Sequence, residues 1–124
     1  MLRKFVAAAA AALLAVAAIT ATILPGNASA FFAWRVADVP KWDTLNVRAW
    51  PSSSSKILVA YPSGVVLSMT GKCTGGVALD AINGWPKWKQ REMVRTRWCE
   101  VWVDPAGNGQ FRTAWVYGKY IAPL

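Results

Sequence analysis

Short runs of alternating apolar and polar residues, separated by turn residues, extend from residue 45 to the end of the chain. Leu45 and Val47 alternate with Asn46 and Arg48, which gives an extended strand one apolar face and one polar face. Because no long helical pattern is present, this arrangement predicts an all-β fold, a small barrel or sandwich of about five to six short strands. The further strands are predicted at residues 56–61, 65–73, 98–103 and 111–117, with a short last stretch at Ile121.

Turn residues mark the connections between these strands. Gly64 and Gly118 are interpreted as turn glycines with positive φ. Residues 104–109 combine Asp, Pro, Asn and Gly in a pattern typical of a hairpin loop. The segment 77–94 is longer than a hairpin connection needs. Within it, residues 87–94 fit either a helical turn or a strand, and the pattern does not decide between them.

The N-terminal region has the pattern of a secretory signal peptide. Residues 3–4 are basic, residues 5–19 are uninterrupted apolar, and residues 28–30 place small side chains where a signal peptidase cleaves. An uncleaved membrane anchor is the alternative, because the apolar stretch approaches the roughly 20 residues that cross a bilayer. The high alanine content and the small-residue triplet favour cleavage. We therefore predict a signal peptide at residues 1–30, a single domain at residues 31–124, and a periplasmic or extracellular location.

The predicted domain is small, and its core is expected to need reinforcement. It contains two cysteines, Cys73 and Cys99, separated by 99 − 73 = 26 positions. In an exported domain such a pair is expected to form a disulfide. The spacing differs from the C-x-x-C pattern of redox enzymes, so we expect a structural bridge without a redox role.

The net charge of the predicted domain is strongly positive. Of the 14 Lys and Arg residues, 2 precede residue 31, which leaves 12 against 6 acidic residues and a net charge of +6. This balance favours anionic partners such as cell-wall polymers or lipid headgroups, although a basic surface without a specific ligand is equally compatible with it. Nucleic acid is not expected as a partner of an exported protein. Membrane contact beyond the signal peptide is expected only weakly, through the basic residues 87–97.

All 8 tryptophans lie after residue 30, too many for so small a core to bury completely. Several of them must therefore lie on the surface or in a groove. Exposed aromatic side chains often supply much of the binding energy of an interface.

Four pieces of the sequence, in the right order, resemble motifs of the bacterial SH3-like (SH3b) domain family. Leu45-Asn46-Val47-Arg48, followed by Pro51-Ser52, is similar to the opening motif of the family. The later pieces are similar to its turn, its Trp-x-x-Val strand and its closing strand, at residues 61–65, 98–101 and 115–121. The resemblance covers residues 36–121. Ala114 stands where the family usually has glycine, and residues 77–94 are longer than the usual connection.

The resemblance implies a small SH3-like β-barrel with an insert at residues 77–94. It also implies a non-catalytic binding module of the cell envelope that recognises peptidoglycan or a peptide. Aromatic side chains would contact sugar faces or peptide side chains, and Arg48 would pair with carboxylates. The candidate ligand-binding residues are Trp42, Arg48, Trp50, Trp85, Trp88 and Tyr117.

Each of these side chains also has a purely structural alternative. Each candidate tryptophan could pack in the core, and Arg48 could lie across an indole or pair with Asp43. Trp98 and Trp115 are assigned to structure alone.

Catalysis is not expected. The chain contains no histidine, which removes the commonest general base and the usual zinc ligand. Cysteines in a disulfide serve neither as nucleophiles nor as metal ligands. Acidic residues such as Asp80 and Glu92 show no spacing that indicates a glycosidase pair. We therefore expect no enzyme activity, no cofactor and no metal site.

The alternative function is that of a protein-interaction or structural subunit. An inhibitor or assembly factor of this kind would dock an envelope protein through residues 77–94. An SH3-like domain without an attached enzyme fits this alternative, because it has no catalytic domain to direct to the wall. Retention on cell-wall sacculi would favour the first function, and capture of one envelope protein would favour the second.

Overall fold

The computed structural model describes residues 32–124. The predicted signal peptide at residues 1–30 lies outside the described residues. The chain divides into two compact units, and the unit Phe31–Leu124 contains everything described below.

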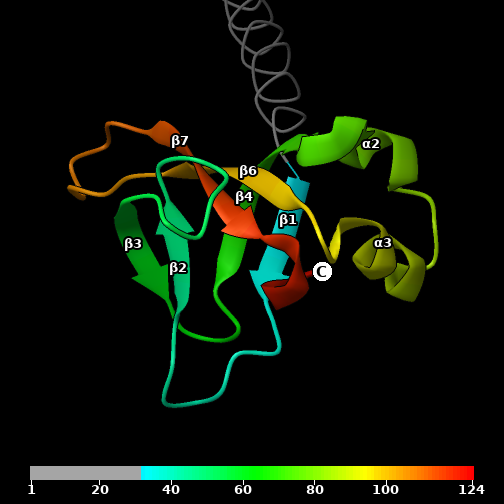
Figure 1. Ribbon diagram of the computed structural model, residues 1–124, viewed down its shortest axis with the longest axis horizontal. Helices are drawn as coiled ribbons and strands as arrows, with labels where there is room; N and C mark the ends of the chain where they lie inside the picture. Colours follow the sequence, from blue (N-terminus) through cyan, green and yellow to red (C-terminus); the bar gives the residue numbers. More distant parts are fainter. Residues whose placement is uncertain (1–31) are drawn as a thin grey trace, which may run out of the picture. The chain divides into compact units, whose positions relative to one another are not determined.

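Eight antiparallel strands form one sheet, so the all-β prediction is confirmed (Figure 1). Their order is β3-β2-β7-β6-β4-β1-β8, and the short β5 pairs with β4 outside this path. The expected count of about five to six strands was too low. The sheet is also not closed, because β3 and β8 end the hydrogen-bonded order. The strands are β1 (Phe32–Val36), β2 (Leu45–Arg48), β3 (Ile57–Tyr61), β4 (Val66–Cys73), β5 (Val77–Ala78), β6 (Trp98–Val103), β7 (Arg112–Tyr117) and β8 (Ile121–Pro123).

Strand β1 was not predicted, although it lies between two other strands of the sheet. It pairs with β4 along one edge and with β8 along the other. Trp34 and Val36 point into the core, where they are 4% and 0% exposed, while Ala33 and Arg35 point outward. Among residues 32–124, Trp34 is the only tryptophan of the buried core, and Trp42, Trp50, Trp88 and Trp102 are exposed. The expectation that several tryptophans lie on the surface is therefore confirmed.

The two faces predicted for β2 are observed. Leu45 and Val47 are buried, and Asn46 and Arg48 are half-buried on the opposite face. The same alternation in β6 and β7 directs their apolar side chains inward. The core residues of these strands are Cys99, Val101, Val103, Ala114 and Val116.

The disulfide between Cys73 and Cys99 is formed, as predicted. The two residues are directly opposite each other on β4 and β6, with their Cα atoms 4.0 Å apart. The bond closes the base of the long segment between these strands. This segment, residues 74–97, extends the insert predicted at residues 77–94 by three residues at each end and is called the insert below. The disulfide is typical of an oxidising compartment.

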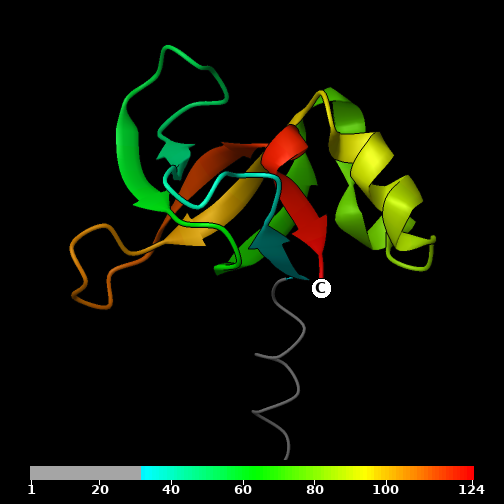
Figure 2. The ribbon, with the colours of Figure 1, turned by 90° about the horizontal axis from the view of Figure 1, so that it is seen from below.

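The insert contains two short helices, α2 (Leu79–Ile82) and α3 (Lys87–Val94), which decides the question that the sequence left open. Figures 1 and 2 show these helices on the opposite side of the central strands from the β2–β3 hairpin. The insert helps to complete the core with Leu79, Ile82 and Val94. The buried side-chain nitrogen Nε2 of Gln90 donates hydrogen bonds to backbone oxygens of the α2–α3 connection. Because the core and the disulfide both lie within Phe31–Leu124, we expect this unit to fold by itself.

Gly118 differs from its predicted role. Gly64 has φ +90°, as expected for a turn glycine, but Gly118 does not have a positive φ. Instead, Gly118 lies against the backbone at the end of the insert. A Cβ atom there would be 1.8 Å from the carbonyl oxygen of Val94, and the Gly118 N–H donates to the oxygen of Arg97 over 2.7 Å. The residue is therefore required for close packing of the closing turn against α3.

Candidate binding groove

An open groove of about 1050 Å³ runs along β2. Half-buried aromatic rings line its floor: Trp98 of β6, Tyr117 at the end of β7, and Tyr120 in the 3₁₀ turn η2 (Gly118–Tyr120). The loop before β2 and the loop after it form the two ends. Its other lining residues are Asp38, Val39, Pro40, Asp43, Thr44, Leu45, Asn46, Arg48, Pro51, Ser52, Ser53 and Lys119.

The groove arises where β2 separates from β7. Strand β2 pairs with β3 along its whole length, but it meets β7 only at the pair Arg48↔Trp115. The edge of β2 before Arg48 therefore has no neighbouring strand on that side. The groove lies along this edge, between β2 and Tyr117.

The three aromatic rings of the floor follow one another in contact. The ring centroids of Trp98 and Tyr117 are 5.3 Å apart, and those of Tyr117 and Tyr120 are 6.3 Å apart. Each pair is tilted by 56°, so the floor is ridged rather than flat. Trp98 and Tyr117 are cross-strand partners, which explains why their side chains lie on the same face.

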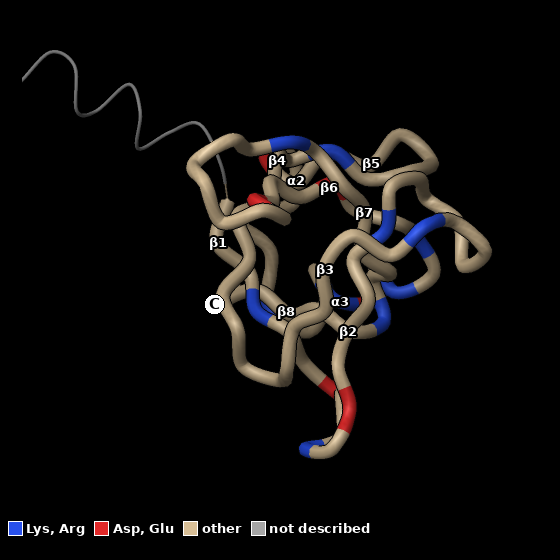
Figure 3. Tube along the Cα trace, turned by 90° about the vertical axis from the view of Figure 1, so that its left-hand side faces the viewer, with Lys and Arg blue, Asp and Glu red and all other residues tan. Residues whose placement is uncertain are grey.

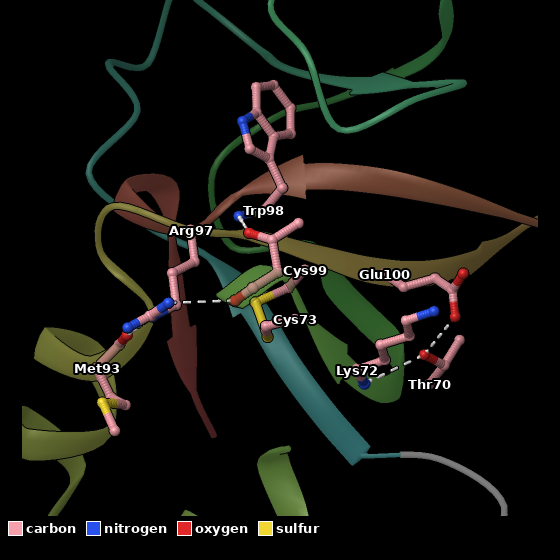
Figure 4. Close-up of a disulfide and its surroundings, with 9 residues drawn as sticks. Thr70, Lys72, Cys73, Met93, Arg97, Trp98, Cys99 and Glu100 are labelled. Carbon is pink, nitrogen blue, oxygen red and sulfur yellow. Dashed lines mark hydrogen bonds between the residues drawn. A yellow bond between two sulfur atoms is a disulfide. The ribbon is translucent and has the colours of Figure 1, made fainter. Parts of the chain in front are cut away.

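Trp98 points outward because the next residue points inward. Cys99 is buried and bonded to Cys73, and side chains alternate along a strand. Figure 4 shows the indole of Trp98 pointing away from the disulfide. The backbone N–H of Trp98 donates to the Thr74 hydroxyl oxygen over 3.0 Å, which ties the start of β6 to the start of the insert.

The groove carries charges of both signs, and two of them are held by other groups. Asp38 forms an ion pair with Arg91 of α3. Arg48 donates from Nη1 to the backbone oxygen of Ser55 over 2.8 Å, in the loop after β2. This contact replaces the pairing with Asp43 or with an indole that was considered for Arg48.

The other two charges of the groove remain without a charged partner. No basic side chain of residues 32–124 pairs with Asp43, and no acidic one pairs with Lys119. The Lys119 ammonium lies 5.6 Å from the ring centroid of Tyr120. Figure 3 shows the loop between β1 and β2, which carries Asp43, extending away from the sheet.

The predicted site residues fall into three groups. Arg48 and Tyr117 line the groove. Trp42 and Trp50 lie on the loops at its two ends, where they are 89% and 68% exposed without lining the hollow itself. Trp85 and Trp88 belong to the insert. Trp85 packs against the core beneath the Lys89 ammonium, and Trp88 is 68% exposed on α3. The structure thus places only Arg48 and Tyr117 within the groove, with Trp42 and Trp50 beside it.

Among the lining residues, only Arg48 and Tyr117 were predicted from the sequence as site residues, and those that were missed include Trp98, Lys119 and Tyr120. Trp98 was assigned to structure alone, and Lys119 and Tyr120 were covered only as part of the closing motif at residues 115–121. A signal for Trp98 was present, because an inward Cys99 requires an outward neighbour. Nothing comparable indicated Tyr120, whose place depends on how η2 folds back. Trp115 pairs with Arg48 and Glu100 across the sheet and does not line the groove.

Outside the groove, residues 32–124 contain a smaller hollow and no cluster of potential metal-binding side chains. A smaller hollow of about 230 Å³ lies between β1 and the insert, beside Trp85 and Lys87. No group of three or more potential metal-binding His, Cys, Asp or Glu side chains occurs in this part of the chain. None of its helices is long and apolar enough to cross a membrane.

Comparisons of the chain with protein-family models, with curated proteins and with solved structures gave no match. The function is therefore argued from the groove itself.

Proposed function

We propose that the protein is a non-catalytic, SH3-like binding module of the cell envelope that holds peptidoglycan in the groove along β2. The observation that carries this proposal is the continuous aromatic floor of Trp98, Tyr117 and Tyr120 between loops with charges of both signs. Aromatic rings provide apolar contact area at low entropic cost, and polar groups at the rim orient the ligand.

The shape of the groove supports a polymeric ligand rather than a small molecule. The groove is open along β2 and has aromatic residues on the loops at both ends, Trp42 and Trp50. A chain-like ligand can lie along such a groove and leave at either end. Peptidoglycan combines sugar rings, which pack on aromatic side chains, with charged stem peptides.

The predicted location of the protein supports the same ligand. The Cys73–Cys99 disulfide is typical of an oxidising compartment outside the cytoplasm, where cell-wall polymers are found. The positive charge of the predicted domain, +6 from 12 basic and 6 acidic residues, favours an anionic polymer. The absence of histidine from the chain favours binding over catalysis.

The test is retention of purified, oxidised residues 31–124 on insoluble peptidoglycan at low salt and at about 0.3 M salt, where exposed charges are largely screened. Retention at the higher salt is expected if the aromatic floor holds the ligand. Loss of all retention at that salt would mean that only the net charge attracts the wall, and the proposal would fail.

A second candidate function is supported by the surface of α3. Trp88 and Met93 are 68% and 36% exposed on this helix, which fits a protein that docks an envelope partner through the insert. This alternative predicts that substitution of Trp88 abolishes partner capture, whereas substitution of Tyr117 does not. The wall-binding proposal predicts the opposite order for retention on sacculi.

A further inference from the structure

The charges that line the groove differ in whether the protein itself already pairs them. Asp38 is neutralised by Arg91, and Arg48 is tied to the carbonyl oxygen of Ser55. Asp43 and Lys119 are both exposed, and neither pairs with an opposite charge within residues 32–124. The groove therefore keeps one carboxylate and one ammonium available for a ligand.

The positions of these two groups are fixed by local structure. Asp43 accepts a hydrogen bond from the Thr44 N–H through Oδ1, at 2.7 Å, which orients its carboxylate at the entry to β2. Lys119 belongs to η2, and its ammonium lies over the ring of Tyr120. An ammonium over an aromatic face keeps the N–H donors on its other side available for a carboxylate. The two free charges thus lie on the β2 side and the floor side of the groove.

From this arrangement we infer that the groove reads zwitterionic stem peptides, with Lys119 binding a ligand carboxylate and Asp43 binding a ligand amine. The inference rests on the proposed function and specifies which chemical groups of the wall the groove recognises. Peptidoglycan stem peptides supply both groups, a free carboxylate at a peptide end and an amine on a diamino side chain. A neutral glycan would leave both protein charges unpaired, and a purely anionic polymer would be opposed by Asp43.

The test compares three preparations of sacculi: untreated, with carboxylates converted to carboxamides, and with amines acetylated. Retention of residues 31–124 is measured on each at about 0.3 M salt, so that general charge attraction is screened. Amidation and acetylation are each expected to weaken retention by about fivefold, or about 1 kcal/mol, because a charge pair that the bound ligand partly buries is screened less by salt than an exposed one.

Two variants assign these losses to the two residues. On untreated sacculi, the retention of Lys119→Gln should be about fivefold weaker than that of the unsubstituted protein. Amidation of the sacculi should not weaken the retention of this variant any further. Asp43→Asn should likewise be retained about fivefold more weakly on untreated sacculi, and acetylation of the sacculi should not weaken its retention any further. The matched controls are Lys41→Gln and Asp80→Asn, which remove the same charges from exposed positions that do not line the groove. Both controls should respond to the treated walls as the unsubstituted protein does.

The possible results distinguish a failure of this inference from a failure of the proposed function. Retention of the unsubstituted protein that is equal on all three preparations would overturn the zwitterionic inference and leave wall binding intact. An equal response of Lys119→Gln and Lys41→Gln to amidation would overturn the role of Lys119. Absence of retention on untreated wall would overturn the proposed function and the inference with it.

Discussion

Arg91 of α3 and Asp38 in the loop before β2 form an ion pair that joins the insert to the end of the groove. Asp38 is the only non-glycine residue with positive φ among the described residues, at +58°. The neighbouring backbone is also held, because Ala37 donates its N–H to the oxygen of Tyr120 over 2.8 Å. The insert therefore supports one end of the groove from outside, and it removes one negative charge from the lining.

Retention on the wall should depend on the middle ring of the aromatic floor. Tyr117 contacts Trp98 on one side and Tyr120 on the other. Tyr117→Leu keeps an apolar side chain on the strand but removes both ring contacts, so apparent affinity for sacculi should fall about tenfold. Binding isotherms at about 0.3 M salt would measure this loss. An unchanged affinity, with an unchanged urea midpoint, would exclude Tyr117 from the ligand contacts.

Two tryptophans of equal exposure should behave differently on the wall. Trp50 and Trp88 are both 68% exposed, but Trp50 follows β2 at one end of the groove and Trp88 lies on α3. Trp50→Ala should weaken retention by about threefold to tenfold because an exposed indole near the ligand contributes contact area. Trp88→Ala should leave retention unchanged. A larger loss of retention for Trp88→Ala than for Trp50→Ala would indicate that the ligand binds to the insert instead of the groove.

Gly118 should tolerate no side chain. In Gly118→Ala the new Cβ would meet the backbone oxygen of Val94 at 1.8 Å, and α3 would have to move. We expect a loss of about 3 kcal/mol in the free energy of unfolding, measured by urea titration. Gly84→Ala is the control, because its Cβ meets nothing within 4 Å and its φ is not positive. Similar stability of the two variants would contradict the close packing described for η2.

Reduction of the disulfide should destabilise the domain more than any change in the groove. The bond joins residues 26 positions apart, and closure of a loop of this length accounts for about 3.5 kcal/mol of unfolding free energy. Urea titrations with and without reductant would measure the difference. The Cys73→Ala/Cys99→Ala double variant should resemble the reduced protein, and its stability should no longer respond to reductant.

Much of the sheet could be predicted because its strands show local alternation. The outward and inward residues of β2, β6 and β7 are visible in the sequence, and the disulfide followed from two cysteines in a small domain. Strand β1 escaped prediction because its residues continue directly from the apolar N-terminal region. Only its pairing with β4 and β8, both distant in sequence, distinguishes it as a strand.

The groove was harder to predict than the sheet, because it depends on contacts between distant segments. Arg48 and Tyr117 were predicted from the resemblance to SH3b domains, as a carboxylate partner and as an aromatic contact. Tyr120 and Lys119 reach the groove only because η2 packs against the end of α3, with Gly118 at the contact. No local pattern encodes that approach. Trp85 and Trp88 of the insert drew attention by composition alone, and the structure places them outside the groove.

The pairing of β1 with β8 also bears on when the sheet can form. Val36 pairs with Ile121 and Trp34 with Pro123, so the first described strand has its final neighbour nearly at the other end of the domain. During synthesis, β1 leaves the ribosome long before β8, and the core around Val36 and Ile121 stays incomplete in the meantime. The nascent chain therefore remains open until its last strand has emerged.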